Sequence, residues 1–434
     1  MEGRESVMTA DHIQVVPSGP VLAAIRPPSS KSITNRAYIC AALARGESTL
    51  LQPLESDDTH VMNDSLRKLG IAIAVEKQSS ETAVRINGCA GALPASNAEL
   101  FIGNSGTSVR FLTAMLCLGH GTYTIDGVPR MRERPITDLL DALTSLGASA
   151  KSETGCPPVR VEANGLTGGN VTIRGNISSQ YLSGLLMAAP YANEPTIIKL
   201  DGELISRPYV EMTTAVMAEF GVEVESDETQ FAVPVSSYVG KEYAIEPDAS
   251  AASYIWAAAA ITGGEAEVLG LSRDSLQGDV GFCDLLVQMG CEITQTSTGI
   301  SIKGTGKLRG IDCNMADVSD TAQTLSAVAL FAEGPTTIRG IAHNRHKETD
   351  RIGNLAIELR KFGATVDEFD DGFRVTPPDQ LSPAEIDTYD DHRMAMSLAL
   401  PGLKVPGVVI RDPGCTAKTY PHFFEDLKTI SSPS

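Results

Sequence analysis

A cluster of small, polar and charged residues leads into an Ala- and Leu-rich stretch six times along the chain, at intervals of roughly 70 to 75 residues. The six clusters lie around Lys31, Gly106, Gln180, Ser250, Thr321 and Arg393. Each is expected to begin a helix. A helix start exposes unpaired backbone N–H groups and the positive end of the dipole, so each cluster is a candidate anion site. The repeat predicts a modular fold with several such sites.

A second repeat runs in phase with the first and consists of glycines that end helical patterns. These are Gly70, Gly147, Gly221, Gly290 and Gly363. A β-branched strand pattern follows each glycine, as expected where Gly adopts positive φ at a helix end. The resulting α/β units number six and divide naturally into two sets of three. The last unit is cut short, and the strand-like segments His12–Val16 and Val21–Pro27 can supply its missing strand.

Composition narrows the class of protein. A chain of 434 residues with 42% hydrophobic content can bury a large core in two or three domains. No apolar run is long enough to span a membrane, and the first residues lack the apolar segment of a secretion signal. Eight cysteines without a CxxC pair are typical of reduced thiols. We therefore expect a cytoplasmic protein that does not bind membranes.

Charge indicates the kind of ligand. The formal net charge of -19 argues against nucleic-acid binding. Many basic residues nevertheless lie beside the helix starts, which favours a focused site for a small, multiply charged anion. The histidines have no metal-ligand spacing, so we expect no metal.

Two glycine- and serine-rich segments begin predicted helices. In Ser29–Arg36, the side chains of Lys31, Ser32 and Arg36 are expected to share the first turns of a helix. A surface capping cluster is the alternative interpretation. In Gly103–Arg110, glycines allow an anion to approach the backbone amides, but the Lys-Ser/Thr pair of a nucleotide-binding loop is absent.

Two further segments carry polar groups suited to anions or hydroxyls. Pro129–Pro135 holds three arginines and one glutamate between prolines, and a solvated charged turn is its alternative interpretation. Ser178–Gln180 supplies neutral donors, or simply a helix cap.

Acidic groups suited to proton transfer accompany the cations. In His346–Arg351, Lys347, Glu348 and Arg351 are expected to share one face at a helix start. Glu348 is then a candidate proton carrier or part of a structural ion-pair network. Asp320 lies where other units carry cations, as an N-cap or a proton acceptor.

These segments resemble those of the enolpyruvyl transferases, most closely the branch that acts on shikimate 3-phosphate. The resemblance covers SSKSITNR, LFIGNSGTSVR, PRMRERPI, ISSQYLSGLLMAAP, SRPYVE, DASAASY, SDTAQT, HKETDRI, YDDHRMAM and CTAKTYP. It implies two similar domains, each of three βαβαββ units with helices inside and sheets outside. The implied domains are residues 1–29 plus 247–434 and residues 30–246, with crossovers near 29 and 247.

The resemblance also implies the reaction. The enolpyruvyl group of phosphoenolpyruvate moves to the 5-hydroxyl of shikimate 3-phosphate through a tetrahedral ketal, and phosphate is released. The implied enzyme needs no cofactor, acts on these two small molecules, and works as a monomer in a cleft between the domains.

Site residues follow from the matching motifs. The implied ligands of shikimate 3-phosphate are Lys31, Ser32, Arg36, Ser178, Ser179, Gln180, Ser206, Tyr209, Asp320, His343 and Lys347. Those of phosphoenolpyruvate are Lys31, Gly106, Arg130, Gln180, Arg351, Arg393 and Lys418. Asp320, Glu348 and Lys31 are the implied proton carriers. His343 departs from the family, because many members have Asn there.

Two alternatives stay open at this point. The sister enzymes that act on UDP-N-acetylglucosamine share the fold but carry a reactive Cys near the loop that corresponds to Pro129–Pro135, where this chain has none. A non-catalytic polyanion-binding protein of related fold would require a more basic surface.

Overall fold

The computed structural model describes residues 8–9, 11–78 and 81–431. Within it the chain divides into two compact units. Residues 29–246 form one of them, here called the inserted unit. Residues up to Pro28 and from Pro247 onward form the other, the split unit.

Six four-stranded sheets with one common topology build the two units. In each sheet one outer strand is parallel to its neighbour, and the remaining neighbours are antiparallel. A helix connects the two parallel strands in most copies, and a second helix leads to the antiparallel hairpin. This is the βαβαββ pattern, so the expected α/β fold of two similar units with three modules each is confirmed.

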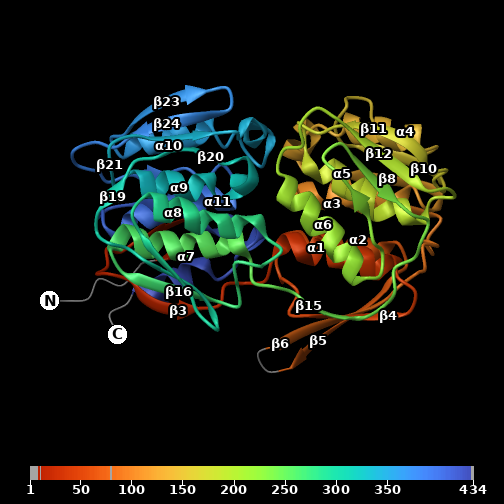
Figure 1. Ribbon diagram of the computed structural model, residues 1–434, viewed down its shortest axis with the longest axis horizontal. Coiled ribbons are helices and arrows are strands. Elements are labelled where there is room, and N and C mark those ends of the chain that lie inside the picture. The colour runs from red at the N-terminus through yellow and green to blue at the C-terminus, as the bar shows by residue number, and fades with distance from the viewer. Residues whose placement is uncertain (1–7, 10, 79–80, 432–434) are drawn as a thin grey trace. The chain divides into compact units, whose positions relative to one another are not determined.

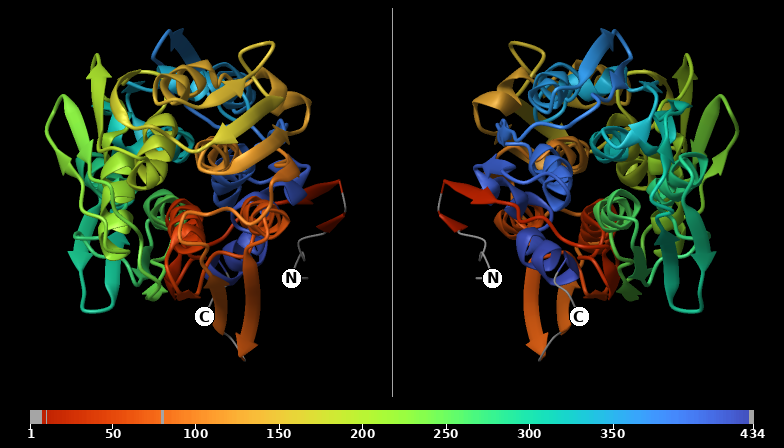
Figure 2. Two further views of the ribbon diagram at one scale, coloured as in Figure 1. Left: turned by 90° about the vertical axis from the view of Figure 1, so that its right-hand side faces the viewer. Right: turned by 90° about the vertical axis from the view of Figure 1, so that its left-hand side faces the viewer.

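The described part of the inserted unit contains three sheets and six α-helices. Its sheets have the orders β15-β4-β6-β5, β7-β8-β10-β9 and β11-β12-β14-β13. The strands are β4 (Glu47–Leu51), β5 (Ala72–Gln78), β6 (Glu81–Asn87), β7 (Asn97–Phe101), β8 (His120–Asp126), β9 (Ser149–Lys151), β10 (Val159–Asn164), β11 (Gly169–Arg174), β12 (Thr196–Asp201), β13 (Glu225–Ser226), β14 (Gln230–Val233) and β15 (Glu242–Ala244). The helices are α1 (Lys31–Leu43), α2 (Asp57–Lys68), α3 (Gly106–Leu116), α4 (Thr137–Ser145), α5 (Ser179–Ala188) and α6 (Arg207–Glu219). Figure 2 shows the hairpin of β5 and β6 projecting from this unit.

The split unit repeats this organisation with strands from both parts of the chain. Its four-stranded sheets have the orders β17-β18-β16-β3, β20-β22-β24-β23 and β1-β2-β26-β25. The strands are β1 (Met8–Thr9), β2 (His12–Gln14), β3 (Leu22–Ile25), β16 (Glu265–Leu269), β17 (Glu292–Gln295), β18 (Gly299–Lys303), β20 (Asp312–Asn314), β22 (Thr336–Arg339), β23 (Thr365–Phe369), β24 (Gly372–Thr376), β25 (Glu385–Ile386) and β26 (Val409–Arg411), with a short pair β19 (Leu308–Arg309) and β21 (Ala332–Glu333). The helices are α7 (Ala249–Thr262), α8 (Phe282–Gln288), α9 (Ala322–Ala329), α10 (Gly353–Lys361), α11 (His392–Ala399) and α12 (Phe423–Ser431). The expected N-terminal contribution is confirmed for His12–Val16, because β2 pairs with β26 of the last module. The strand of the second segment, β3, instead pairs with β16 of another module, so the expectation was wrong for Val21–Pro27.

The first helix of each module lies in the core of its unit. Every residue of α3, α7, α9 and α11 is buried. In the split unit, α7, α9 and α11 lie between the sheets at its two ends (Figure 1). In α1 and α5 the residues that are not fully buried are Lys31, Ser32 and Gln180, all at the helix start. The repeated apolar stretches are therefore inner helices, and in α1 and α5 the polar start is the accessible part.

The five repeated glycines end helices as expected. Gly70, Gly147, Gly221, Gly290 and Gly363 all have φ between 86° and 108°. A side chain is strained in that region, so these positions favour Gly. A strand of the same module follows each of them within a few residues.

Candidate active site

The split unit gathers charged side chains around Asp320, which lies in the 3₁₀ helix Ala316–Thr321 before α9. The Asp320 carboxylate has three cationic neighbours. Its Oδ1 lies 3.3 Å from Lys347 Nζ and 3.4 Å from Arg351 Nη1. Its Oδ2 accepts a hydrogen bond of 2.8 Å from Arg393 Nη2. Asp320 therefore joins three cations that come from different parts of the split unit.

Glu348 forms a second acidic centre in the same cluster. Its Oε2 lies 2.9 Å from Arg351 Nη2, and its Oε1 lies 3.1 Å from Lys418 Nζ. The Glu348 side chain is only 7% exposed. Because Arg351 contacts both Glu348 and Asp320, the two carboxylates share one guanidinium.

Asp391 holds Arg351 from its other side. Arg351 Nε donates to Asp391 Oδ2 at 2.7 Å, and Nη2 donates to Oδ1 at 3.1 Å. Asp391 is also the N-cap of α11, where Oδ1 accepts from the backbone N–H of Arg393 at 2.9 Å. Burial alone would lower the pKa of Arg351, but the carboxylates of Asp391 and Glu348 raise it. Arg351 thus remains a fixed positive charge.

Positive charge exceeds negative charge by one in this cluster. Its members are the cations Lys347, Arg351, Arg393 and Lys418 and the carboxylates Asp320, Glu348 and Asp391. Burial lowers the pKa of Lys347, because desolvation disfavours its charged form. An anionic ligand would stabilise the charged lysine, so the arrangement favours anion binding.

His343 lies beside this cluster as a neutral side chain. Its Nε2 is 3.0 Å from Ser319 Oγ. Burial, followed by the nearby charge of Lys347, lowers the pKa of His343 to about 3. His343 is therefore suited to hydrogen bonding without adding charge to the cluster.

The segment from Lys347 to Arg351 is not helical, contrary to the sequence-based expectation. Helix α10 begins only at Gly353. Asp350 determines that start, because its Oδ1 accepts hydrogen bonds of 3.0 Å from the backbone N–H groups of Ile352 and Gly353. The preceding bend still brings Glu348 to Arg351, so the expected contact forms without the expected helix.

In the inserted unit, Lys31 lies at the start of α1. Ser30 caps this helix by accepting a hydrogen bond of 3.3 Å from Ile33 N. Lys31 Nζ lies 3.6 Å from Asp58 Oδ2, and both side chains are largely buried. Sequence reasoning did not find Asp58, although its place in the first turn of α2 offered a signal.

Arg36 is a buried cation held by neutral oxygens. Its Nε donates to Thr213 Oγ1 at 2.7 Å, and its Nη1 donates to Ser32 O at 2.8 Å. Its Nη2 donates to Tyr209 O at 2.9 Å, and the guanidinium lies 5.2 Å from the ring centre of Phe111. Burial lowers the pKa of Arg36 to about 10, so it is charged at neutral pH.

Gly106 begins α3 and lies against Arg134. A Cβ at Gly106 would lie 2.3 Å from Arg134 Nη2. Arg134 is buried and its Nη1 donates to Asn104 O at 3.1 Å. Arg130 is more exposed and pairs with Glu133 at 2.8 Å. Of the arginines in this loop, Arg130 was the one expected from the sequence to bind phosphoenolpyruvate. In the structure Arg134 is the one that lies against Gly106.

The remaining candidates of the inserted unit lie at the starts of α5 and α6. Ser178 caps α5 by accepting from Gln180 N at 3.3 Å, and Ser179 is the first residue of that helix. Gln180 Nε2 lies 3.5 Å from Thr107 Oγ1 on α3. Ser206 precedes α6 with φ of 54°.

Two further kinds of feature bear on the class of protein: a metal-binding cluster and a membrane-spanning helix. No group of three or more His, Cys, Asp or Glu side chains among the described residues has the geometry to hold a metal ion. Within the same part of the chain, no helix has both the length and the hydropathy of a membrane span.

The chain is similar to known proteins along nearly its whole length. The model of the family EPSP synthase (3-phosphoshikimate 1-carboxyvinyltransferase) matches residues 15–427. A 3-phosphoshikimate 1-carboxyvinyltransferase of Nostoc punctiforme is 47% identical, over 93% of this chain and 95% of the relative. The chloroplastic enzyme of that name from Brassica napus is 45% identical, over 97% and 86%. The solved structure of an EPSP synthase from Acinetobacter baumannii aligns with a TM-score of 0.80 at 26% identity, covering 97% of this chain and 98% of the other.

Proposed function

This chain belongs to the EPSP synthase (3-phosphoshikimate 1-carboxyvinyltransferase) family, and we propose that it transfers the enolpyruvyl group of phosphoenolpyruvate to the 5-hydroxyl of shikimate 3-phosphate. The observation that carries the proposal is the cluster in the split unit. There, two carboxylates suited to proton transfer, Asp320 and Glu348, contact cations suited to an anionic substrate. The family match favours this substrate over UDP-N-acetylglucosamine.

The chemistry proceeds by addition and elimination. A proton adds to the methylene carbon of phosphoenolpyruvate, and the 5-hydroxyl oxygen bonds to C2 while losing its own proton. The resulting tetrahedral ketal still carries the phosphate. Loss of a proton from the new methyl group and of the phosphate then restores the double bond. The two steps need groups that exchange protons and cations that hold the anionic groups.

Asp320 and Glu348 are proposed to exchange these protons. Asp320 accepts the proton of the 5-hydroxyl. Glu348, together with Lys31, delivers the proton to the methylene carbon. The contacts of both carboxylates with Arg351 support a common site of action.

Substrate binding is divided between two sets of residues. The proposed phosphoenolpyruvate ligands are Lys31, Gly106, Arg130, Gln180, Arg351, Arg393 and Lys418. The proposed shikimate 3-phosphate ligands are Lys31, Ser32, Arg36, Ser178, Ser179, Gln180, Ser206, Tyr209, Asp320, His343 and Lys347. Among the described residues, the hydrogen bonds of Arg36 go to neutral oxygens, so a phosphate would supply a negative charge for it.

The two units are proposed to act as the two functional domains of one monomer. The proposed enzyme works in the cytoplasm on these two small molecules, without a cofactor, nucleic acid or membrane.

Phosphate release tests the function. Purified protein is given phosphoenolpyruvate alone, with shikimate, or with shikimate 3-phosphate. We expect phosphate release only with shikimate 3-phosphate, accompanied by a product that carries the enolpyruvyl group. Equal release in all three mixtures, or none in any, contradicts the proposed function.

A further inference from the structure

Tyr254 reaches the charged cluster from the middle of the inner helix α7. Its side chain is buried, and its hydroxyl oxygen accepts a hydrogen bond of 3.3 Å from Arg393 Nη1. The other terminal nitrogen of Arg393 donates to Asp320 at 2.8 Å. The guanidinium of Arg393 is thus held by a carboxylate on one side and by a neutral phenol on the other.

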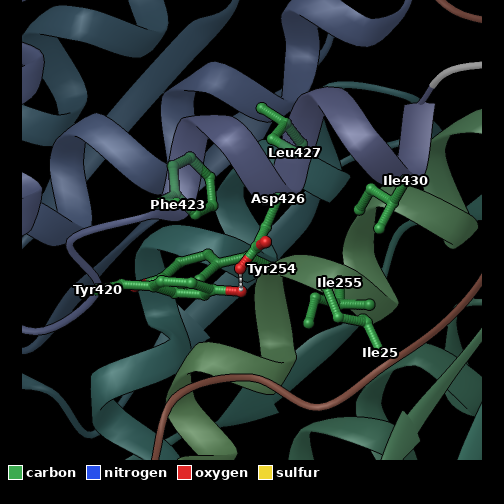
Figure 3. A pocket seen from close by; sticks show the side chains of 8 residues that line it. All are labelled: Ile25, Tyr254, Ile255, Tyr420, Phe423, Asp426, Leu427 and Ile430. Atoms are coloured by element: carbon green, nitrogen blue, oxygen red, sulfur yellow. Dashed lines mark hydrogen bonds between the residues drawn. The ribbon is translucent and has the colours of Figure 1, made fainter. Parts of the chain in front are cut away.

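The ring of Tyr254 rests on the last described helix of the chain. Phe423, the first residue of α12, packs edge-on against Tyr254 with ring centres 5.6 Å apart and planes at 75°. Phe423 makes the same kind of contact with Tyr420, again at 5.6 Å and 75°. Figure 3 shows the rings of Tyr254 and Tyr420 beneath Phe423 of α12. The cavity between them measures only about 10 Å³, so the ring of Tyr254 has little room to move.

A partly buried hydrogen bond ties Tyr420 to the first turn of α12. Tyr420 Oη donates to Asp426 Oδ2 at 2.8 Å, as Figure 3 shows. Burial raises the pKa of the Asp426 carboxyl. Tyr420 also follows Lys418 by two residues, and Lys418 contacts Glu348. The rings therefore support Arg393 through the hydroxyl of Tyr254.

We propose that Tyr254 is a positioning residue of this enzyme, whose hydroxyl, held in place by α12, fixes the guanidinium of Arg393 for phosphoenolpyruvate. The proposal rests on the proposed function, since it takes Arg393 as a ligand of that substrate. Burial raises the pKa of Tyr254 to about 12, so the phenol is neutral and adds no charge that would repel the anion. A mobile arginine would lose side-chain entropy when it binds, and Tyr254 removes much of that cost in advance.

The replacement Tyr254→Phe tests this role because it keeps the ring and removes the hydroxyl. We expect KM for phosphoenolpyruvate to rise about 5- to 10-fold, with kcat and KM for shikimate 3-phosphate changed less than about 2-fold. The matched control is Tyr238→Phe in the inserted unit. Tyr238 is equally buried, and its hydroxyl donates to Met187 O at 3.0 Å, away from the proposed ligands. A purely structural role predicts similar losses of thermal stability in both variants and no selective change in KM.

A second variant tests the contribution of α12. Phe423→Leu keeps the hydroxyl of Tyr254 but removes the ring against which it packs, so we expect a smaller rise in the same KM. Unchanged KM for phosphoenolpyruvate in Tyr254→Phe overturns the proposal, and an unchanged value in Phe423→Leu alone overturns the part played by α12.

A binding measurement separates this inference from the function itself. Phosphoenolpyruvate is added to each protein, and the rise in melting temperature is recorded. We expect a smaller rise for Tyr254→Phe than for Tyr238→Phe. If the parent protein is stabilised but releases no phosphate, the proposed function fails while this comparison still decides the role of Tyr254. If phosphoenolpyruvate stabilises neither the parent nor the variants, the role of Tyr254 in binding this substrate is overturned, whereas phosphate release still decides the proposed function.

Discussion

Burial of His343 links protonation to stability. Its pKa is lowered to about 3 in the folded protein, against an ordinary value near 6.5. Below pH 6.5 the unfolded chain therefore binds a proton that the folded chain does not, and stability falls as the pH decreases. The parent loses stability between pH 6.5 and 4.5. We expect this loss to be roughly 1–2 kcal/mol smaller in His343→Asn.

Denaturant unfolding of both proteins at several pH values in this range checks that expectation. At pH 8, where His343 is neutral in both states, the pH-dependent difference should vanish. If the free energy of unfolding changes equally with pH in the parent and the variant, folding does not lower the pKa of His343.

Asp320 offers a test of the proposed proton transfer. Asp320→Asn keeps the size of the side chain but removes the carboxylate, so we expect turnover to fall roughly 100-fold or more. The matched control is Asp317→Asn, an exposed residue of the same 3₁₀ helix. Steady-state phosphate release measures both variants. A near-normal rate for Asp320→Asn would remove Asp320 from the mechanism.

The residues of the candidate site were easier to predict from the sequence than the residues that they contact. The sequence indicated Asp320, Glu348 and the cations, because their charges are unusual beside predicted helix starts. It did not indicate that Asp391 holds Arg351, since 40 residues separate them and only the packing of α11 brings them together. The contact between Gly106 and Arg134 likewise depends on a loop conformation that spacing does not reveal.

At the scale of elements, the start of α3 makes the most specific prediction. A methyl group at Gly106 would displace the guanidinium of Arg134, which is the flexible end of its side chain. We therefore expect Gly106→Ala to fold normally but to raise KM for phosphoenolpyruvate roughly 10- to 100-fold. Gly19→Ala is the control, because a Cβ at Gly19 meets no atom within 4 Å. Melting temperatures and KM values of both variants test this expectation. A large loss of stability in Gly106→Ala alone would contradict it.

The elements themselves were largely predictable. Inner helices are buried on nearly all sides, and their polar starts mark where they begin, as in α1 and α5. Glycines instead mark the ends of the second helices, such as Gly70 after α2. The helix expected at Lys347 was wrong, because Asp350 accepts from the backbone N–H groups of Ile352 and Gly353 and α10 begins only there. Strands as short as β13 and β25 carry too few residues for a periodic pattern, so their pairing could not be predicted.

At the scale of the whole molecule, both units carry anion-binding groups of the proposed reaction. Lys31 and Arg36 belong to the inserted unit, whereas Asp320 and Lys347 belong to the split unit. In the proposed reaction one substrate engages both sets, so we expect its binding to restrict the two units to a compact arrangement. We expect shikimate 3-phosphate to lower the radius of gyration in X-ray scattering toward about 22 Å, the value for a compact chain of this length. Shikimate without its phosphate is the control, and an unchanged radius with shikimate 3-phosphate would contradict closure.

The division of the split unit also sets an order of events during synthesis on the ribosome. Strand β3 pairs with β16, and β2 pairs with β26, so the first strands translated must await partners from the second half of the chain. At about 5 to 20 residues per second, β3 waits roughly ten seconds or more. The inserted unit meanwhile emerges complete. Ribosome-bound chains that end shortly after Glu246 should therefore resist proteolysis within residues 29–246 while their N-terminal strands are cleaved, and uniform cleavage would contradict this order.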